Sequence, residues 1–258
     1  MIPHRKNRFI NALFEHHARS QLGKNFRKVS FTQTSAVPEF EPNVPVIAIA
    51  NHSSWWDPML ALFLTRYILK KEGYGIMAEE QLRRYGILRR IGVYSVNRES
   101  NQEGRAFLEY TRELLAGTGR LLWIYPQGEL ISSEQIPLDF KKGFVQILKL
   151  FPRVHLFKMV ASYDFWIESK PEVVVDFLPL ETLSPAKGAE YSDRLVERVA
   201  AEMTGRLVEV RRIVRTRDDK ALRPVIVQAT GTHPVYDAYR QARAALSGRK
   251  FHAHHGAE

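Results

Sequence analysis

The chain has 258 residues, a formal net charge of +10 and a pI near 9.8, and it contains no cysteine. The absence of cysteine excludes disulfides, thiolate metal sites and cysteine nucleophiles, and it fits a reducing compartment. The charge favours a partner that carries negative charge, such as an anionic membrane surface, a phosphate-bearing co-substrate or nucleic acid. Because no apolar run approaches the roughly 18 residues of a membrane-spanning helix, and the first residues lack a signal-peptide pattern, we expect a soluble or peripheral protein.

Residues 1–30 are expected to form a basic amphipathic helix. Phe9, Leu13 and Phe14 share one helical face, and lysine and arginine side chains flank that face. A helix of this kind can lie in the headgroup layer of an anionic membrane. The alternative is a helix that packs on the domain and turns its basic side to solvent.

The rest of the chain alternates apolar, β-rich runs with helical patterns, which is typical of an α/β domain. No internal repeat or linker divides residues 31–247, so we expect a single domain there, followed by a disordered tail at 248–258. Predicted strands lie at the start of 30–43 and at 46–50, 74–78, 93–98, 120–125, 154–163 and 172–179, the last of them antiparallel or at an edge. Predicted helices lie at 59–69, 79–90, 103–116, 140–150 and 191–215.

The candidate catalytic residues lie directly after the strand at 46–50. The segment reads Asn-His-Ser-Ser-Trp-Trp-Asp-Pro over residues 51–58, and functional side chains of open α/β sheets lie just beyond the carboxyl ends of their strands. If this segment coils into a helical turn, the carboxylate of Asp57 reaches one nitrogen of His52. The other nitrogen then becomes an oriented base that can take a proton from a hydroxyl group. The alternative is an ordinary helix cap beside a surface histidine.

The string Asn-His-x-Ser-x-x-Asp after a buried strand resembles the signature of the glycerolipid acyltransferase family, which includes the lysophosphatidic acid acyltransferases. A second motif of that family places a Gly before a strand and an Arg after it, and the Arg contacts the phosphate of the acceptor. Gly92 and Arg98 stand at that spacing, with Ser95 and Asn97 as departures from the usual residues between them. A guanidinium suits phosphate because it donates two parallel charge-assisted hydrogen bonds. Without the first motif, Arg98 would be interpreted as a plain surface residue.

A third, partial resemblance follows the strand at 120–125, where Pro-Gln-Gly-Glu stands in place of the family's Pro-Glu-Gly. Gln127 occupies the position of the usual Glu, and no Arg follows, which leaves recognition of a glycerol phosphate open; a neutral Gln127 can still hydrogen-bond a hydroxyl. Gly128 suits a tight turn or a close approach to ligand. Lys141, Lys142 and Gly143 begin a predicted helix and are candidates for anion binding, or else form a solvated helix start.

The resemblance covers roughly residues 40–180 and implies an α/β fold with a mixed, mostly parallel central sheet flanked by helices. It implies acyl-CoA or acyl carrier protein as the thioester donor, with no bound cofactor or metal, and a cytoplasmic, peripheral position on the inner face of the cell membrane. In the implied mechanism His52 deprotonates the acceptor hydroxyl, Asp57 orients His52, and no acyl-enzyme forms. The expected acceptor is a lysophospholipid, namely 1-acylglycerol-3-phosphate. The departures at the third motif keep another lipid hydroxyl, such as that of a glycosylated carotenoid, as an alternative.

Two other classes of function are alternatives. A nucleic-acid binder would explain the charge, but the sequence carries no zinc module, RNP string or helix-turn-helix pattern. A non-catalytic membrane-surface protein would explain the charge and the first helix, but it would have no need of His52 and Asp57. The histidines of the tail are interpreted as part of a disordered end and not as a metal site.

Overall fold

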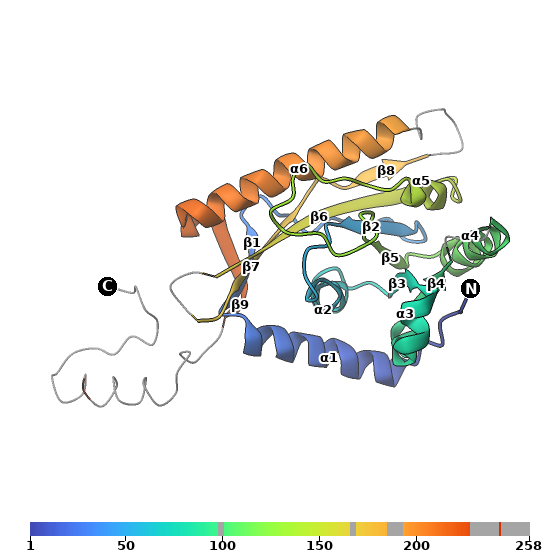
Figure 1. The fold of residues 1–258 in the computed structure, drawn as a ribbon, viewed down its shortest axis with the longest axis horizontal. Coiled ribbons are helices and arrows are strands. Elements are labelled where there is room, and N and C mark those ends of the chain that lie inside the picture. Colours follow the sequence, from blue (N-terminus) through green and yellow to red (C-terminus); the bar gives the residue numbers. More distant parts are fainter. Residues whose placement is uncertain (98–100, 166–168, 185–192, 228–242, 244–258) are drawn as a thin grey trace.

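A nine-stranded sheet forms the centre of the described structure (Figure 1). The computed structural model describes residues 1–97, 101–165, 169–184, 193–227 and 243. The strands are β1 (Lys28–Thr32), β2 (Val46–Ala50), β3 (Gly73–Ala78), β4 (Val93–Val96), β5 (Leu121–Ile124), β6 (Val154–Asp164), β7 (Glu172–Phe177), β8 (Glu181–Leu183) and β9 (Leu222–Val227). The α-helices are α1 (Arg8–Asn25), α2 (Asp57–Phe63), α3 (Glu79–Arg84), α4 (Asn101–Leu115), α5 (Gly143–Leu148) and α6 (Asp193–Thr216), and the shorter helical turns are η1 (Leu64–Ile68), η2 (Gly86–Ile91) and η4 (Asp219–Ala221).

The strand order is β4-β3-β5-β2-β6-β7-β1-β9, with β8 paired to β6. β2 is parallel to both of its neighbours, β3 is parallel to β4 and β5, and β7 is parallel to β1. The antiparallel pairs are β6 with β7, β1 with β9, and β6 with β8. The prediction of a mixed, mostly parallel sheet is therefore confirmed.

The prediction that β7 is antiparallel or at an edge is confirmed in its first alternative. The strand is antiparallel to β6 and is not an edge strand, because β1 and β9 continue the sheet beyond it. The N-terminal strand β1 thus lies between β7 and β9, two strands from much later in the sequence. Sequence patterns describe the burial of a strand but not its neighbours, which is why the sequence left both alternatives open.

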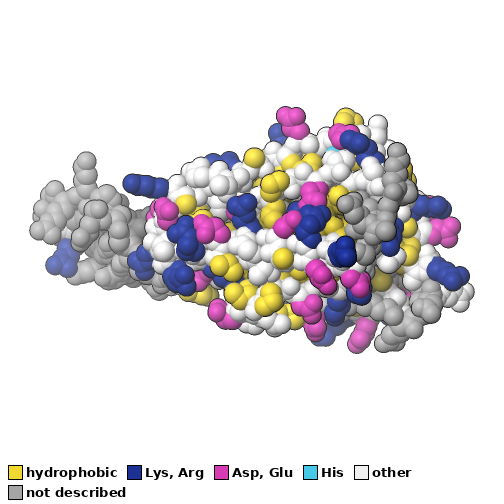
Figure 2. Space-filling view, turned by 90° about the horizontal axis from the view of Figure 1, so that it is seen from above, with side chains coloured by type: hydrophobic (Ala, Val, Ile, Leu, Met, Phe, Trp, Pro, Cys, Tyr) yellow, Lys and Arg dark blue, Asp and Glu magenta, His cyan; other side chains and the backbone are white. Residues whose placement is uncertain are grey.

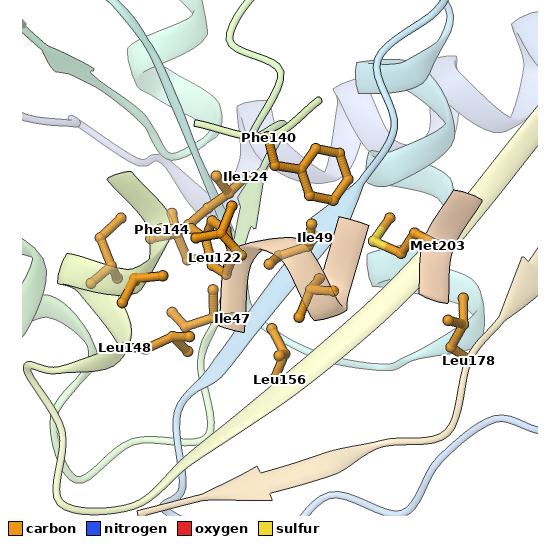
Figure 3. Close-up of a cluster of buried hydrophobic side chains, with 14 of the residues drawn as sticks. Ile47, Ile49, Leu122, Ile124, Phe140, Phe144, Leu148, Leu156, Leu178 and Met203 are labelled. Carbon is orange, nitrogen blue, oxygen red and sulfur yellow. The ribbon is translucent and has the colours of Figure 1, made fainter. Parts of the chain in front are cut away.

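The central strand β2 is buried on both faces, which explains its uninterrupted apolar sequence. Ile47 and Ile49 belong to the core layer beneath α4, α5 and α6, whereas Val46, Ala48 and Ala50 belong to the layer beneath α1 and α2. Figure 3 shows the first layer, in which side chains of the sheet meet those of α5 and α6, among them Leu122, Phe144, Leu156 and Met203. The sheet is therefore covered by helices on both faces (Figure 1).

Helix α6 confirms the amphipathic pattern predicted for it. The residues of its apolar stripe are all buried against the sheet: Leu195, Val199, Met203, Leu207 and Val210. Its other side carries intrahelical ion pairs such as Arg198–Glu202 and Arg212–Glu209. Seen from this side, the surface is a mixture of cationic, anionic and apolar side chains (Figure 2).

The helix predicted over residues 1–30 is α1, which covers only Arg8–Asn25, and the chain from Lys28 to Thr32 forms β1. The predicted helices at 103–116 and 191–215 differ from α4 and α6 by one or two residues at their ends, and the other three differ as follows. The helix predicted at 59–69 begins two residues earlier, at Asp57, and its last turn is the π-helical η1. The helix predicted at 79–90 ends at Arg84, and η2 follows and closes at Gly92 with φ of 97°. The helix predicted at 140–150 is reduced to α5, because the backbone N–H of Lys141 is bonded to Pro126 and holds the preceding segment in a loop. β8 was not predicted.

Candidate active site

His52 and Asp57 lie together at the carboxyl end of β2. The Nδ1 atom of His52 is 2.9 Å from Oδ2 of Asp57. The contact is possible because residues 51–56 form a tight connection and α2 begins at Asp57 itself. The Asp57 side chain is 1% exposed, whereas that of His52 is 19% exposed. The predicted contact is therefore present, with the carboxylate inside the protein and the imidazole at its surface.

The carboxylate of Asp57 accepts several hydrogen bonds besides the one from His52. Oδ2 accepts from the backbone N–H groups of Ser53 and Ser54, each at 2.9 Å. Oδ1 accepts from the hydroxyl of Tyr163 at 2.6 Å. A buried carboxylate needs hydrogen-bond donors in place of the water it has lost, and these groups supply them.

The imidazole of His52 stacks on the ring of Tyr125, with ring centroids 4.3 Å apart and an interplanar angle of 21°. The Tyr125 hydroxyl is buried and has no hydrogen-bond partner among the described residues. Burial raises the pKa of Tyr125 well above its usual value, and the negative charge of Asp57 adds to that effect. The uncharged ring of Tyr125 therefore limits the orientations that the imidazole of His52 can adopt.

The loop after β5 holds the backbone of His52 on both sides. Oε1 of Gln127 accepts a hydrogen bond from the His52 backbone N–H at 2.6 Å, and the backbone N–H of Ile131 donates to the His52 carbonyl at 2.9 Å. Gly128 adopts φ of 82°, as expected for a tight turn after the strand. The buried side chain of Gln127 thus supports the His52 loop, a contact that the sequence did not predict.

The other predicted binding residues are placed differently. The ammonium group of Lys141 is 3.8 Å from a carboxylate oxygen of Glu129, and that of Lys142 is 2.8 Å from Asp193. Gly143 is the first residue of α5. Arg98 lies outside the described residues.

A pocket of about 170 Å³ lies beside this loop. Its lining is mostly polar and consists of Gln127, Glu129, Ile131, Gln135, Pro137, Asp139 and Lys141. Because Gln127 contacts the backbone of His52, the pocket adjoins the dyad. It offers carboxamides, carboxylates and one lysine to a bound molecule.

Sequence reasoning assigned no role to three residues that shape the dyad: Asn51, which it noted only as part of the signature string, Tyr125 and Tyr163. The carboxamide of Asn51 bonds to the backbone of Ala161 on β6. Ala161 and Tyr163 are two residues apart on β6, so their side chains lie on the same face of the sheet, the face that carries the loop after β2. That spacing on the strand was a signal available in the sequence, but it had meaning only once β6 was known to pair with β2.

The arrangement is suited to proton transfer at one imidazole nitrogen. With Nδ1 hydrogen-bonded to a carboxylate, Nε2 is left to accept a proton from a hydroxyl group. Within the described part of the chain, no group of His, Asp and Glu side chains is arranged to hold a metal ion. Among the same residues, no helix has the length and apolarity needed to cross a membrane.

Comparison with known proteins gives this site a context. A family model described as Acyltransferase matches residues 28–160, which contain His52 and Asp57 and make up more than half of the chain. The crystal structure of the 1-acyl-sn-glycerophosphate (LPA) acyltransferase PlsC from Thermotoga maritima is similar with a TM-score of 0.54 and 17% sequence identity, over 78% of this chain and 79% of that one. No curated protein sequence matched the chain. The chain therefore belongs to the acyltransferase family and is an O-acyltransferase with the fold of the glycerolipid enzymes.

Proposed function

We propose that this acyltransferase moves a fatty acyl group from acyl-CoA or acyl-ACP to the hydroxyl of a lysophospholipid, with His52 as the general base. The observation that carries the proposal is the contact between Nδ1 of His52 and the buried carboxylate of Asp57. The structure that shares this fold is an enzyme whose substrate is 1-acyl-sn-glycerophosphate. We take 1-acylglycerol-3-phosphate as the acceptor on that basis.

In the proposed reaction, Nε2 of His52 takes the proton of the acceptor hydroxyl as the oxygen attacks the thioester carbonyl. The new C–O bond forms and the C–S bond breaks, and the proton then passes from His52 to the leaving thiolate. Asp57 stabilises the imidazolium that exists in between. Each bond broken is matched by one formed, so no bound cofactor is required.

The acceptor would lie against the turn of Gln127 and Gly128, with its phosphate on Arg98. The role of Arg98 comes from its place in the second motif and stays a prediction. Lys141 and Lys142 are weaker candidates for the phosphate, because the ammonium group of each already contacts a carboxylate. Binding an anion there would require one of these ion pairs to open.

A second candidate acceptor is a lipid without phosphate, such as a glycosylated carotenoid. The polar pocket beside the dyad favours it, because Glu129 and Asp139 line the pocket and Lys141 is paired with Glu129. Carboxylates and carboxamides hydrogen-bond sugar hydroxyls well, whereas the two carboxylates repel a phosphate.

We further propose that the enzyme binds the cytoplasmic face of an anionic membrane, with α1 at the contact. The α1 side chains of Phe9 and Leu13 are 80% and 57% exposed, and on the adjoining segment Tyr85 and Ile87 are 49% and 53% exposed. The two segments are neighbours, because the backbone of Asn7 bonds to that of Arg90. We call these four side chains, with the exposed Arg8, Arg83, Arg84 and Arg90, the α1 surface. Exposed apolar side chains among cations are the composition expected of a helix that binds anionic lipid.

The decisive experiment measures free thiol release from acyl-CoA with a panel of acceptors. His52→Ala should abolish release, whereas His17→Ala, at an exposed position on α1, should not affect it. Release with 1-acylglycerol-3-phosphate that is lost on Arg98→Ala and kept on Arg105→Ala would support the phosphate acceptor. Release only with glycosylated lipids would support the second candidate. Equal turnover by His52→Ala and the wild type would refute the proposed base.

A further inference from the structure

Tyr163 lies outside the segment matched by the family model, yet it contacts the dyad directly. Its hydroxyl donates a 2.6 Å hydrogen bond to Oδ1 of Asp57. Burial raises the pKa of Tyr163 well above its usual value, and the charge of Asp57 raises it further. The phenol therefore stays protonated and donates its hydrogen bond throughout the neutral pH range.

The position of the hydroxyl is determined by parts of the chain that are distant in sequence. Tyr163 stands on β6, where it pairs with Val173 of β7. Its ring packs against Phe26 with centroids 5.9 Å apart, and Phe26 in turn packs edge-on against Trp56 at 4.9 Å. The hydroxyl of Tyr163 is thus placed by the pairing of β6 in the sheet and by the packing of its ring against Phe26.

We infer that Tyr163 is a positioning residue for acyl transfer: its hydroxyl holds Oδ1 of Asp57 so that Oδ2 stays directed at Nδ1 of His52. The inference rests on the proposed role of His52 as general base. The contacts of Asp57 are divided between its two oxygens, since Oδ2 receives His52 and two backbone N–H groups while Oδ1 receives Tyr163. Rotation of the carboxylate would break bonds at both oxygens at once.

The hydrogen bond also has an electrostatic consequence. A donor on Oδ1 offsets part of the negative charge that Asp57 presents to the imidazole, and a less negative partner favours the imidazolium less. The ionisable side chains that face Asp57 in the described structure come from the loop after β2, the end of β5, and β6: they are His52, Tyr125 and Tyr163. Tyr163 is the one that hydrogen-bonds the second oxygen of Asp57.

The test compares Tyr163→Phe with Tyr94→Phe. Tyr94 is a matched control, because its hydroxyl is also buried and hydrogen-bonded, 2.9 Å from Oγ1 of Thr111, but on β4 at the far edge of the sheet. Steady-state thiol release is measured for both variants from pH 5 to 9, with thermal unfolding alongside. For Tyr163→Phe we expect kcat to fall roughly tenfold with little change in KM, because the base is misaligned. We also expect the acid limb of the kcat profile to move up by roughly 0.5 pH unit, because the imidazolium is stabilised.

For Tyr94→Phe we expect a lower Tm and an unmoved pH profile. If Tyr163→Phe behaves in the same way, with a lower Tm and no shift of the acid limb, Tyr163 is structural only and the inference fails. The proposed function is tested separately by His52→Ala. Loss of turnover in that variant together with an unshifted Tyr163→Phe profile would refute the inference alone, whereas full turnover in His52→Ala would refute the proposed base.

A second variant covers the case in which Tyr163→Phe does not fold. Site-specific replacement of Tyr163 by 3-fluorotyrosine keeps the ring and the hydroxyl but makes the phenol a stronger donor. The inference then predicts the opposite shift, with the acid limb at lower pH than in the wild type. An unmoved acid limb in the folded fluorinated enzyme would contradict it.

Discussion

The side chain of Asn51 is bonded to both backbone groups of Ala161. Its Oδ1 accepts from the Ala161 N–H at 2.8 Å, and its Nδ2 donates to the Ala161 carbonyl at 3.0 Å. Asn51 is 3% exposed, so these bonds have no competition from solvent. The carboxamide of Asn51 therefore bonds to β6 in the way that the backbone of a neighbouring strand would. This contact fixes the start of the loop that carries His52 and Asp57.

Replacing Asn51 by Ala should therefore reduce both stability and activity. It removes two buried hydrogen bonds and leaves the N–H and C=O groups of Ala161 unpaired, at a cost of about 2 kcal/mol in the free energy of unfolding. Urea unfolding and thiol release would measure the two effects. Asn25→Ala, at an exposed helix end, is the control and should change neither by much. A fully active and fully stable Asn51→Ala protein would show that the loop has no need of this anchor.

Gln127 supports the backbone of His52 through a single carbonyl oxygen. Gln127→Glu keeps an acceptor at that position and should retain most of the turnover. Gln127→Ala leaves a buried N–H group at His52 without its partner and should lower kcat roughly tenfold or more. Steady-state kinetics on both variants makes the comparison. If Glu and Ala have the same effect, the hydrogen bond to His52 is not the function of this residue.

A buried ion cluster beneath α6 should make stability depend on acid pH. Lys158 is 3% exposed and contacts Glu181 as well as Glu202, the latter at 2.6 Å. Burial alone would raise the pKa of both glutamates, but hydrogen bonds from Lys158 and Arg198 outweigh it and lower both values below the usual 4.5. Groups with a lowered folded pKa stabilise the protein above their unfolded value, and this contribution disappears as the pH falls through the folded value. Stability should therefore drop below about pH 4.5.

The Lys158→Met variant tests the origin of that pH dependence. At pH 7 it should lose about 1 to 3 kcal/mol of stability, less than for a fully buried pair because both carboxylates are partly in contact with water. The difference from the wild type should shrink as the pH falls below 4.5, because protonated glutamates no longer need the lysine. Lys149→Met, at an exposed position directly after α5, should follow the wild type. A difference that is constant from pH 7 to pH 3 would rule out the ion cluster as its cause.

Removal of the exposed apolar side chains of α1 should weaken binding to anionic vesicles. The double change Phe9→Ser and Leu13→Ser deletes two exposed apolar groups and should lower vesicle binding roughly tenfold or more, since each buried apolar side chain is worth about 1.5 to 3 kcal/mol. It should leave the fold intact, because neither side chain is part of the core. Sedimentation with phosphatidylglycerol vesicles measures the effect.

The matched control is Val208→Ser on α6. Val208 is 45% exposed, but its helix carries ion pairs of both signs, such as Arg198–Glu202 and Arg212–Glu209. It should bind vesicles as the wild type does. Equal binding by all variants would place the membrane contact elsewhere on the protein, and equal loss in both would indicate a general effect of surface polarity.

Local patterns in the sequence determined the elements of this protein and the residues of its dyad. The run at 46–50 is apolar at every position because β2 is covered on both faces, and the stripe of α6 recurs with the helical period because one side of that helix faces the sheet. His52 and Asp57 are five residues apart, so their contact could be predicted from the spacing, on condition that the segment coils, together with the resemblance of the whole string to the family signature.

Only the tertiary structure decided which distant residues support that dyad. Gln127 and Tyr163 contact it across 75 and 106 residues of sequence, respectively. Those contacts depend on the order and register of β5, β2 and β6, and no periodicity within one strand records which strand lies beside it. The same reason explains why the sequence left open whether β7 is antiparallel or at an edge, whereas the fold places it inside the sheet, antiparallel to β6. A local sequence pattern can indicate which residues are buried. The hydrogen bond from Tyr163 to Oδ1 of Asp57, in contrast, forms only because folding places β6 beside β2.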